Sequence, residues 1–250
     1  MVCFRIIPVL LIDNEECFKI IKFKKKIYIG DPINIIKIFN DLGVDEIFVL
    51  NISRQKKIDL NFLKKLSGES FIPLTYGGNI KNLTDVENII KLGYEKISIN
   101  SLLFENIKMV KSIIQEFGSS TINISVNIHK NFFNQYKIYD YKKKKNLSID
   151  IFDYLKQIQD LEPGEILINF VHNDGTKKGF DFEILKKIKP KLNTNIIVYG
   201  GLSSEKEIVK IKDLGFDGVG ASSLFCFQDN FDSILINYIS NDLKELIYDN

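Results

Sequence analysis

The sequence lacks the features that mark several large classes of protein. Its three cysteines, Cys3, Cys17 and Cys226, are odd in number and show no CxxC spacing. This pattern argues against a disulfide framework and a structural zinc site, and favours a reducing compartment. No apolar run reaches the roughly 18 residues of a membrane-spanning helix, and no signal-peptide pattern is present. We therefore expect a soluble, cytoplasmic protein with no metal, no cofactor and no membrane partner.

Charge and histidine content are equally uninformative about partners. The formal net charge is +2 over 250 residues, which is too small to indicate nucleic acid or acidic lipid as a ligand. Lysines cluster at 24–26 and 142–145, and we interpret both runs as solvated loop charge. His129 and His172 are separated and have no carboxylate partner in sequence, so they form no recognisable site.

One tripeptide motif occurs twice in the sequence. Tyr76-Gly77-Gly78 recurs as Tyr199-Gly200-Gly201, and each copy ends an apolar run and precedes a helical pattern. A Leu-Gly-aromatic triplet follows each copy, and then a serine that opens an apolar segment, Ser101 in the first case and Ser223 in the second. The offset is about half the chain, which indicates an internal duplication.

Apolar runs alternate with helical patterns along the whole chain. Strands are predicted at 4–12, 47–52, 71–76, 97–100, 122–128, 166–171, 195–199 and 218–220. Helices are predicted at 31–42, 59–66, 84–92, 105–117, 149–161, 181–188, 204–214 and 229–246, with a small hairpin inserted at 131–147. This rhythm predicts a single (β/α)₈ barrel over residues 1–250, with half-barrels at about 1–119 and 120–250. A doubly wound open sheet would explain the alternation but not the repeat.

The repeated glycines predict anion-binding loops at the C-terminal face of such a barrel. A glycine pair lets the backbone approach a ligand closely, and the loops after strands 7 and 8 of a barrel often bind phosphate. Gly200-Gly201 follows predicted strand 7, and Gly77-Gly78 follows strand 3 in the other half. We interpret the two pairs as two phosphate cradles on opposite sides of one barrel mouth. The alternative is that the glycines only make tight turns.

A set of longer stretches carries a specific resemblance. In order along residues 4 to 227, they are Arg5-Ile6-Ile7-Pro8, Gly30-Asp31-Pro32, Ser98-Ile99-Asn100-Ser101, Gly164-Glu165-Ile166-Leu167, Asp174-Gly175-Thr176 and Gly179-Phe180-Asp181. Together they resemble the cyclase subunit of imidazole glycerol phosphate synthase. That family is a two-fold symmetric barrel that binds a substrate with two phosphates. It receives ammonia through the barrel from a separate glutaminase subunit.

The resemblance implies roles for particular residues. It implies a first phosphate site at Gly77, Gly78, Asn100 and Ser101, and a second at Asp174, Gly175, Gly200, Gly201, Ala221 and Ser222. It also implies a gate for ammonia at the barrel floor, where a glutaminase would dock, formed by Arg5, Glu46, Lys96 and Glu165. Lys19 lies in the first loop, where the family has a lysine that closes over the substrate, although the glycine expected near Glu15 is missing.

The sequence departs from the family at the catalytic positions. The family has an Asp at the end of strand 1 and another at the end of strand 5, and these positions hold Leu11 and Asn127 here. A third carboxylate position, at the end of strand 2, holds Asn51. Leucine and asparagine do not titrate usefully, and each lost acid–base group is worth roughly 10²–10⁴-fold in rate. Asp13 could substitute only from farther out along the same strand.

Three functions follow as hypotheses. The first is a cyclase-like barrel that docks a glutaminase and passes ammonia to another acceptor, for amidination of a surface sugar. The sequence looks like variant cyclase-like proteins found beside amidotransferases for surface sugars. The second is a working lyase of histidine biosynthesis that uses unconventional groups. The third is a non-catalytic scaffold that binds a phosphorylated sugar.

Overall fold

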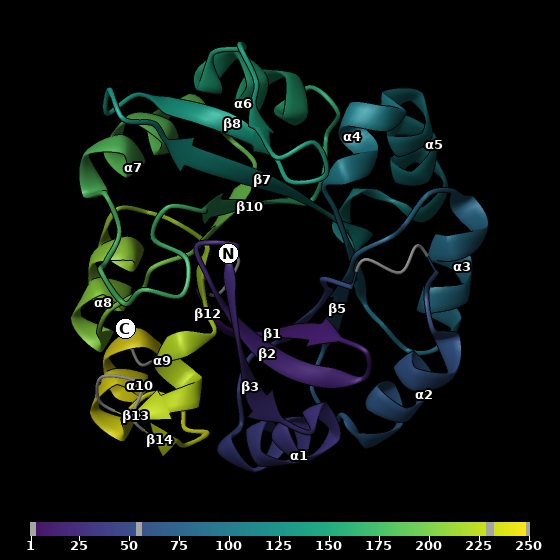
Figure 1. Cartoon of the computed structure of the whole chain (residues 1–250), viewed down its shortest axis with the longest axis vertical. Helices are drawn as coiled ribbons and strands as arrows, with labels where there is room; N and C mark the ends of the chain where they lie inside the picture. The colour runs from purple at the N-terminus through teal and green to yellow at the C-terminus, as the bar shows by residue number, and fades with distance from the viewer. Residues whose placement is uncertain (1–3, 54–56, 229–232, 249–250) are drawn as a thin grey trace.

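Eight parallel strands close into a barrel in a computed structural model that describes residues 4–53, 57–228 and 233–248 (Figure 1). In ring order the strands are β1 (Arg5–Asp13), β4 (Ile47–Asn51), β5 (Leu74–Gly77), β6 (Lys96–Ile99), β7 (Ile122–Lys130), β10 (Glu165–Phe170), β11 (Asn195–Tyr199) and β12 (Gly218–Ala221). The ring closes because β12 pairs with β1, from Arg5 opposite Gly218 to Pro8 opposite Ala221. The predicted (β/α)₈ barrel is confirmed, and an open sheet is excluded.

Helices surround the barrel on all sides. They are α1 (Pro32–Leu42), α2 (Leu60–Glu69), α3 (Leu83–Lys91), α5 (Ile107–Phe117), α6 (Ile151–Gln159), α7 (Phe182–Ile188), α8 (Glu205–Asp213) and α10 (Asn241–Tyr248). Two short helices, α4 (Ser101–Glu105) and α9 (Ser223–Cys226), follow β6 and β12. These short helices begin at the two serines of the sequence repeat. Short 3₁₀ turns lie at Ser119–Thr121 and Lys189–Lys191.

The local sequence explains where the first helix begins and ends. The Asp31 carboxylate accepts a hydrogen bond from the backbone N–H of Asn34 (2.9 Å), and Pro32 occupies the first helical position. Gly43 ends the helix in a left-handed conformation with φ 62°. Between these ends, the apolar face of α1 packs against the outer surface of the barrel. Helix packing of this kind buries one face of each strand, while the other face points into the barrel.

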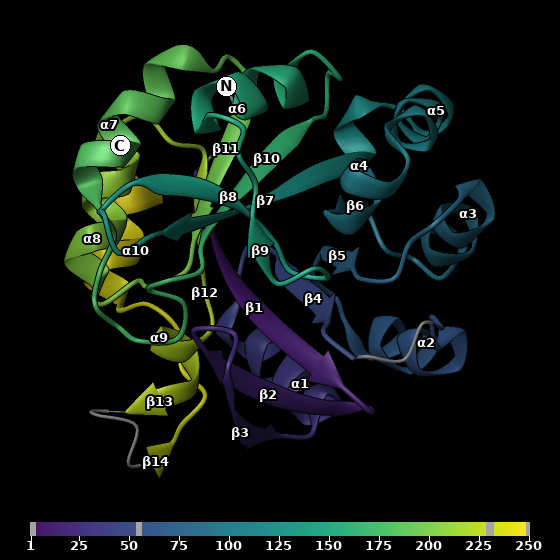
Figure 2. The same ribbon diagram turned by 45° about the horizontal axis from the view of Figure 1, so that its top comes forward.

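Two hairpins are inserted at the C-terminal ends of barrel strands. The first, β2 (Glu16–Ile21) and β3 (Lys25–Gly30), continues β1, so the segment predicted as a loop is a hairpin. The second, β8 (Tyr136–Asp140) with β9 (Lys145–Asn146), continues β7 and is the predicted insertion. Figure 2 shows β2 and β3 beside β1, and β8 beside β7; the pairings join β2 to the last residues of β1 and β8 to the last residues of β7. They therefore border the mouth.

Other predictions were wrong in detail. The predicted helix 229–246 is instead a short strand β14 (Ser233–Ile234), which pairs with β13 (Phe227–Gln228), followed by an irregular segment and α10. Residues 229–232 lie outside the described ranges. The predicted helix 105–117 breaks at Asn106, whose side chain caps α5 by accepting from the Met109 N–H (3.1 Å). Strand β5 begins at Leu74, three residues later than predicted, which leaves Phe71 outside it.

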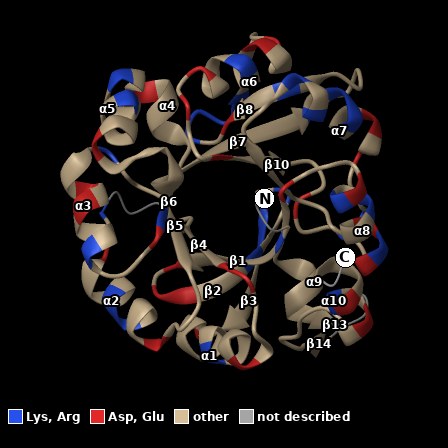
Figure 3. Cartoon of the chain, turned by 180° about the vertical axis from the view of Figure 1, so that it is seen from behind, with Lys and Arg blue, Asp and Glu red and all other residues tan. Residues whose placement is uncertain are grey.

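The outer surface is mixed in charge. Figure 3 shows lysine and arginine interspersed with aspartate and glutamate over the surrounding helices. Cys17 and Cys226 are buried free thiols, and Cys3 lies outside the described residues. Over the described ranges, no helix is long and apolar enough to cross a membrane.

Candidate functional site in the barrel interior

Four charged side chains meet at the N-terminal floor of the barrel. Arg5 pairs with both Glu46 and Glu165, and Lys96 pairs with the same two carboxylates, at 2.6 Å from Glu165 and 3.3 Å from Glu46. Glu46 and Glu165 are buried. Although burial works against its charge, the two carboxylates raise the pKa of Arg5. The sequence predicted these four as a gate; the structure brings them together in one ring, and their gating role stays a prediction.

Above the ring, one wall of the barrel interior is polar. Thr75 donates a hydrogen bond to Glu46, and higher up Ser98 donates to Asn123 Oδ1 (2.8 Å). Thr75, Ser98 and Asn123 are all buried. Among the described residues, the Nδ2 group of Asn123 makes no hydrogen bond. Side chains on one face of a strand recur at every second residue, so Lys96 and Ser98 share the inner face of β6. Polar groups thus connect the ring to the mouth.

The opposite wall of the interior is apolar. A separate cluster of buried side chains fills it: Ile7, Val9, Leu11, Ile20, Phe48, Leu167, Ile197 and Tyr199. These come from β1, β2, β4, β10 and β11, whereas the polar wall comes from β5, β6 and β7. The interior is therefore two-sided.

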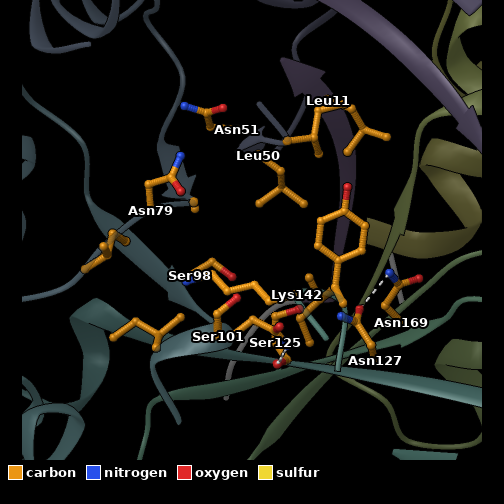
Figure 4. Close-up of a pocket in the computed structure, with 18 of the residues that line it drawn as sticks. Leu11, Leu50, Asn51, Asn79, Ser98, Ser101, Ser125, Asn127, Lys142 and Asn169 are labelled. Carbon is orange, nitrogen blue, oxygen red and sulfur yellow. Dashed lines mark hydrogen bonds between the residues drawn. The ribbon is translucent and has the colours of Figure 1, made fainter. Parts of the chain in front are cut away.

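A pocket of about 160 Å³ opens at the mouth (Figure 4). Its described lining includes five asparagines, at positions 51, 79, 100, 127 and 169, and three serines, at positions 98, 101 and 125. Leu11 and Leu50 face Asn127 and Asn169 across it. Asn127 accepts a hydrogen bond from Asn169 Nδ2 (3.1 Å). The family positions Leu11, Asn51 and Asn127 therefore do share one pocket, and none of the three is an acid.

The other candidate acid–base positions do not supply a catalytic group. The Asn51 amide donates to the Tyr76 hydroxyl (3.3 Å), and its oxygen accepts from the Ser53 N–H (2.9 Å). Asp13 forms an ion pair with Lys26 inside the first hairpin and lines a second, outer cavity of about 410 Å³. It does not line the pocket that holds Leu11 and Asn127.

Asp174 is the one carboxylate that lines the mouth pocket in the described part of the chain. Its side chain is buried, and burial raises its pKa to about 7, with Tyr199, the Gly175 N–H and Lys19 acting in the opposite direction. Lys19 is fully buried, with Nζ 4.7 Å from the centre of the Phe227 ring. Burial and the neighbouring Lys177 lower the pKa of Lys19 to about 7. A carboxyl that lines the pocket thus interacts electrostatically with a buried amine, and the pKa of each is about 7.

The residues predicted for the second phosphate site line a small cavity of about 10 Å³. It includes Asp174, Gly175, Gly201, Ala221 and Ser222, but not Gly200. A void of this size holds about one water molecule. The first hairpin covers it, because the Lys22 N–H donates to the Asp174 carbonyl (3.0 Å). Phosphate binding here stays a prediction, and it requires the hairpin to move.

Gly175 is where the hairpin approaches most closely. A Cβ at Gly175 would lie 2.1 Å from the Ile20 carbonyl oxygen, and φ is +71°. We expect Gly175→Ala to displace the hairpin and to speed tryptic cleavage at its lysines several-fold. Gly43→Ala is the matched control, since Gly43 has φ +62° but open space around it; it should show only the backbone cost of about 1–2 kcal/mol. Equal cleavage of the two variants would contradict a packed hairpin.

The repeated double glycines have a packing explanation. A Cβ at Gly78 would lie 2.5 Å from the Asn51 carbonyl oxygen, and one at Gly200 would lie 2.5 Å from Asn169 Oδ1. Each pair therefore passes directly against the end of the preceding barrel strand, and Gly78, Gly200 and Gly201 have a positive φ. Gly77, Gly78, Asn100 and Ser101, the predicted first phosphate site, do line the mouth pocket together. The glycines are needed there whether or not a phosphate binds.

Sequence reasoning missed several contributors to the site. Ser125 and Asn169 line the pocket, and both follow from alternation along β7 and β10. Lys142 was interpreted as solvated charge, yet it lines the pocket from the second hairpin and pairs with Glu105 (2.7 Å). No local signal could reveal Lys142, since its position depends on how the hairpin folds. The two histidines contact Tyr139 and Tyr136 outside the pocket.

Residues 5–232 match the protein family described as "Histidine biosynthesis protein". The chain belongs to this family. A protein of Leptospira interrogans named "Putative imidazole glycerol phosphate synthase subunit HisF" is 36% identical over 98% of both chains. One of Vibrio vulnificus (strain YJ016), named "Putative imidazole glycerol phosphate synthase subunit hisF3", is 35% identical over 96% of this chain and 95% of its own. The "Imidazole glycerol phosphate synthase subunit HisF" of Alkaliphilus metalliredigens (strain QYMF) is 31% identical over 98% of both.

This HisF-like member of the histidine biosynthesis family has the barrel fold that the resemblance implies, but it lacks the two aspartates implied at the mouth. The resemblance stated from the sequence is confirmed. At the two positions where that resemblance implies catalytic aspartates, the structure places a buried leucine and a buried, hydrogen-bonded asparagine. The floor ring retains all four charges.

Proposed function

We propose that this protein is the cyclase-like barrel of a glutamine amidotransferase complex. A glutaminase subunit docks on the N-terminal face, and ammonia passes through the barrel to an acceptor bound at the mouth. The observation that carries the proposal is the continuity of polar groups, from the ring of Arg5, Glu46, Lys96 and Glu165 through Thr75, Asn123 and Ser98 to the pocket. Relatives named as HisF subunits support the same general role.

The acceptor is a surface sugar that is amidinated, and ring closure is not the reaction. Ring closure requires acid–base groups at positions 11 and 127, whereas Leu11 and Asn127 offer an aliphatic contact and an amide. The pocket suits a ligand rich in hydroxyl and amide groups, because asparagine and serine side chains both donate and accept hydrogen bonds. An acetamido group would place its methyl on Leu11 and Leu50 and its amide near the Asn127–Asn169 pair. A phosphate on the ligand would lie near Lys142 and Ser101.

Blocking the polar wall tests the passage. Asn123→Leu replaces a buried amide in the barrel interior by an aliphatic group of similar size. We expect product formation from glutamine to fall at least tenfold, while the same reaction with free ammonium salt at the mouth changes less than twofold. The assay pairs the chain with a glutaminase subunit encoded in the same genome. Ile197→Leu, on the apolar wall, is the control and should leave both reactions unchanged. An equal loss with both nitrogen sources would refute an internal passage.

A second candidate, an active cyclase of histidine biosynthesis, is favoured by one observation. Asp174 lines the mouth pocket, and burial raises its pKa to about 7, which suits proton transfer at neutral pH. Formation of imidazole glycerol phosphate with free ammonia decides between the two. Turnover close to that of an ordinary enzyme, abolished in Asp174→Asn, would support the cyclase and refute amidination as the main reaction.

A further inference from the structure

The barrel floor carries an aromatic side chain that makes almost no contact with the rest of the chain. Phe71 is 91% exposed, although it lies only three residues before the buried strand β5. Burying a phenylalanine is worth roughly 1.5–3 kcal/mol relative to leaving it in water. A partner that covered this side chain would therefore gain binding free energy from it.

The backbone around Phe71 is firmly held. The Phe71 N–H donates to Asn40 Oδ1 (3.1 Å), and Asn40 Nδ2 donates to the Glu69 carbonyl (2.7 Å). The Ser70 hydroxyl donates to the Ile72 carbonyl (2.8 Å). Asn40 belongs to α1, which lies beside α2 in both views (Figures 1 and 2). The aromatic ring is thus presented by an ordered loop, so that little conformational entropy would be lost when it is buried by a partner.

The same loop adjoins the charged ring. The Pro73 carbonyl accepts from the Ile47 N–H (3.0 Å), next to Glu46, and the Leu74 carbonyl accepts from the Glu95 N–H (3.0 Å), next to Lys96. The segment that carries Phe71 is therefore hydrogen-bonded to the starts of both neighbouring strands. Each of those starts bears a member of the ring.

We propose that Phe71 is the apolar anchor on which the glutaminase subunit docks over the barrel floor. This inference rests on the proposed function. Neutral ammonia can cross from one protein to another only where bulk water is excluded, and the ring alone cannot exclude it, because the Arg5 and Lys96 side chains remain 16% and 21% exposed. An exposed, ordered aromatic beside the opening can, because buried aromatic anchors carry much of the energy of protein interfaces. The partner surface it fits is an apolar pocket at the exit of the ammonia-producing site.

The chain offers a matched control. Phe132 is also a fully exposed phenylalanine in a hydrogen-bonded turn, where Asn131 Oδ1 accepts from the Phe133 N–H (2.9 Å) and the Gln135 N–H (3.0 Å). It lies in the turn between β7 and β8, at the mouth end of the barrel, whereas Phe71 precedes β5 at the floor. Truncating either ring removes no internal packing, so both variants should fold as the parent does.

The test measures the dissociation constant of the full chain for the glutaminase subunit, and glutamine hydrolysis at saturating barrel concentration. We expect Phe71→Ala to weaken binding 10- to 100-fold and Phe132→Ala to change it less than twofold, with hydrolysis still stimulated once Phe71→Ala is saturating. If wild type binds and stimulates the glutaminase and Phe71→Ala binds equally well, this inference fails and the proposed function stands. If wild type binds no glutaminase, both fail. If Phe71→Ala instead dissolves a self-association of the free chain, the anchor belongs to a second copy and the inference fails.

Discussion

Replacing Glu165 with alanine is expected to lower the free energy of unfolding by about 3 kcal/mol. The Glu165 carboxylate is buried and holds both Arg5 and Lys96. Without it, two cations at the barrel floor share Glu46 alone. Breaking a buried ion pair typically costs about 3–5 kcal/mol, and we expect the low end because the Arg5 and Lys96 side chains remain 16% and 21% exposed. Urea denaturation at neutral pH measures the change.

An exposed ion pair gives the matched control. Glu87 pairs with Lys91 at 2.5 Å on the surface of α3, with both side chains more than half exposed. Glu87→Ala should cost less than about 1 kcal/mol.

In the amidotransferase assay, Glu165→Ala should lose glutamine-dependent product and keep the reaction with free ammonia. A Glu165→Ala variant as stable as Glu87→Ala would mean that the floor ring is solvated and not closed.

Asp174→Asn is expected to stabilise the protein at pH 8 by as much as about 4 kcal/mol. The pKa of Asp174 is about 7 in the folded chain, against 3.8 for an ordinary aspartate, and each pKa unit corresponds to 1.36 kcal/mol. Between pH 3.8 and 7 the unfolded chain has released this proton while the folded chain retains it. Wild-type stability from this group therefore falls as pH rises through that window and levels off above it. Asparagine carries no such penalty.

The pH dependence distinguishes this effect from simple repacking. The advantage of Asp174→Asn should vanish below about pH 4, where the carboxyl is protonated in both states. Lys19 acts on the other side of neutrality: its pKa is lowered from 10.5 to about 7, so stability from this group rises as pH increases from 7 to 10.5. Denaturation of wild type and variant at pH 4, 6 and 8 provides the measurement. If the difference in unfolding free energy between wild type and Asp174→Asn stayed constant with pH, the folded chain would not hold the Asp174 carboxyl protonated.

The barrel could be predicted from the sequence because most of its strands are buried on both faces and appear as apolar runs. Part of the polar wall could also have been predicted, because Asn123, Ser125 and Asn127 occupy every second position of one strand and so share one face. Phe71 misled the prediction because an apolar residue next to a strand looks like part of it, and only the fold shows where the strand begins.

Other features depend on contacts between distant segments and leave no local signal. The hairpin at 16–30 is rich in lysine, and its pairing with β1 orders it over the second cradle. Asp174 has a raised pKa because it is buried, and the hairpin contacts it through the hydrogen bond from the Lys22 N–H to the Asp174 carbonyl. The irregular C-terminal segment has enough apolar residues to read as helix, but β14 pairs with β13 instead.

The two mouth hairpins leave the barrel after β1 and β7, which stand four strands apart around a ring of eight. Each hairpin extends from the end of one barrel strand, and the hydrogen bonds that close the barrel are made without it. Changes in the length or composition of a hairpin can therefore accumulate without disturbing the floor ring or the strand register. Under the proposed function, this separation leaves the acceptor side of the molecule free to diversify in evolution while the side that receives ammonia stays fixed. The hairpins are then the units to exchange between relatives when acceptor specificity is to be redesigned.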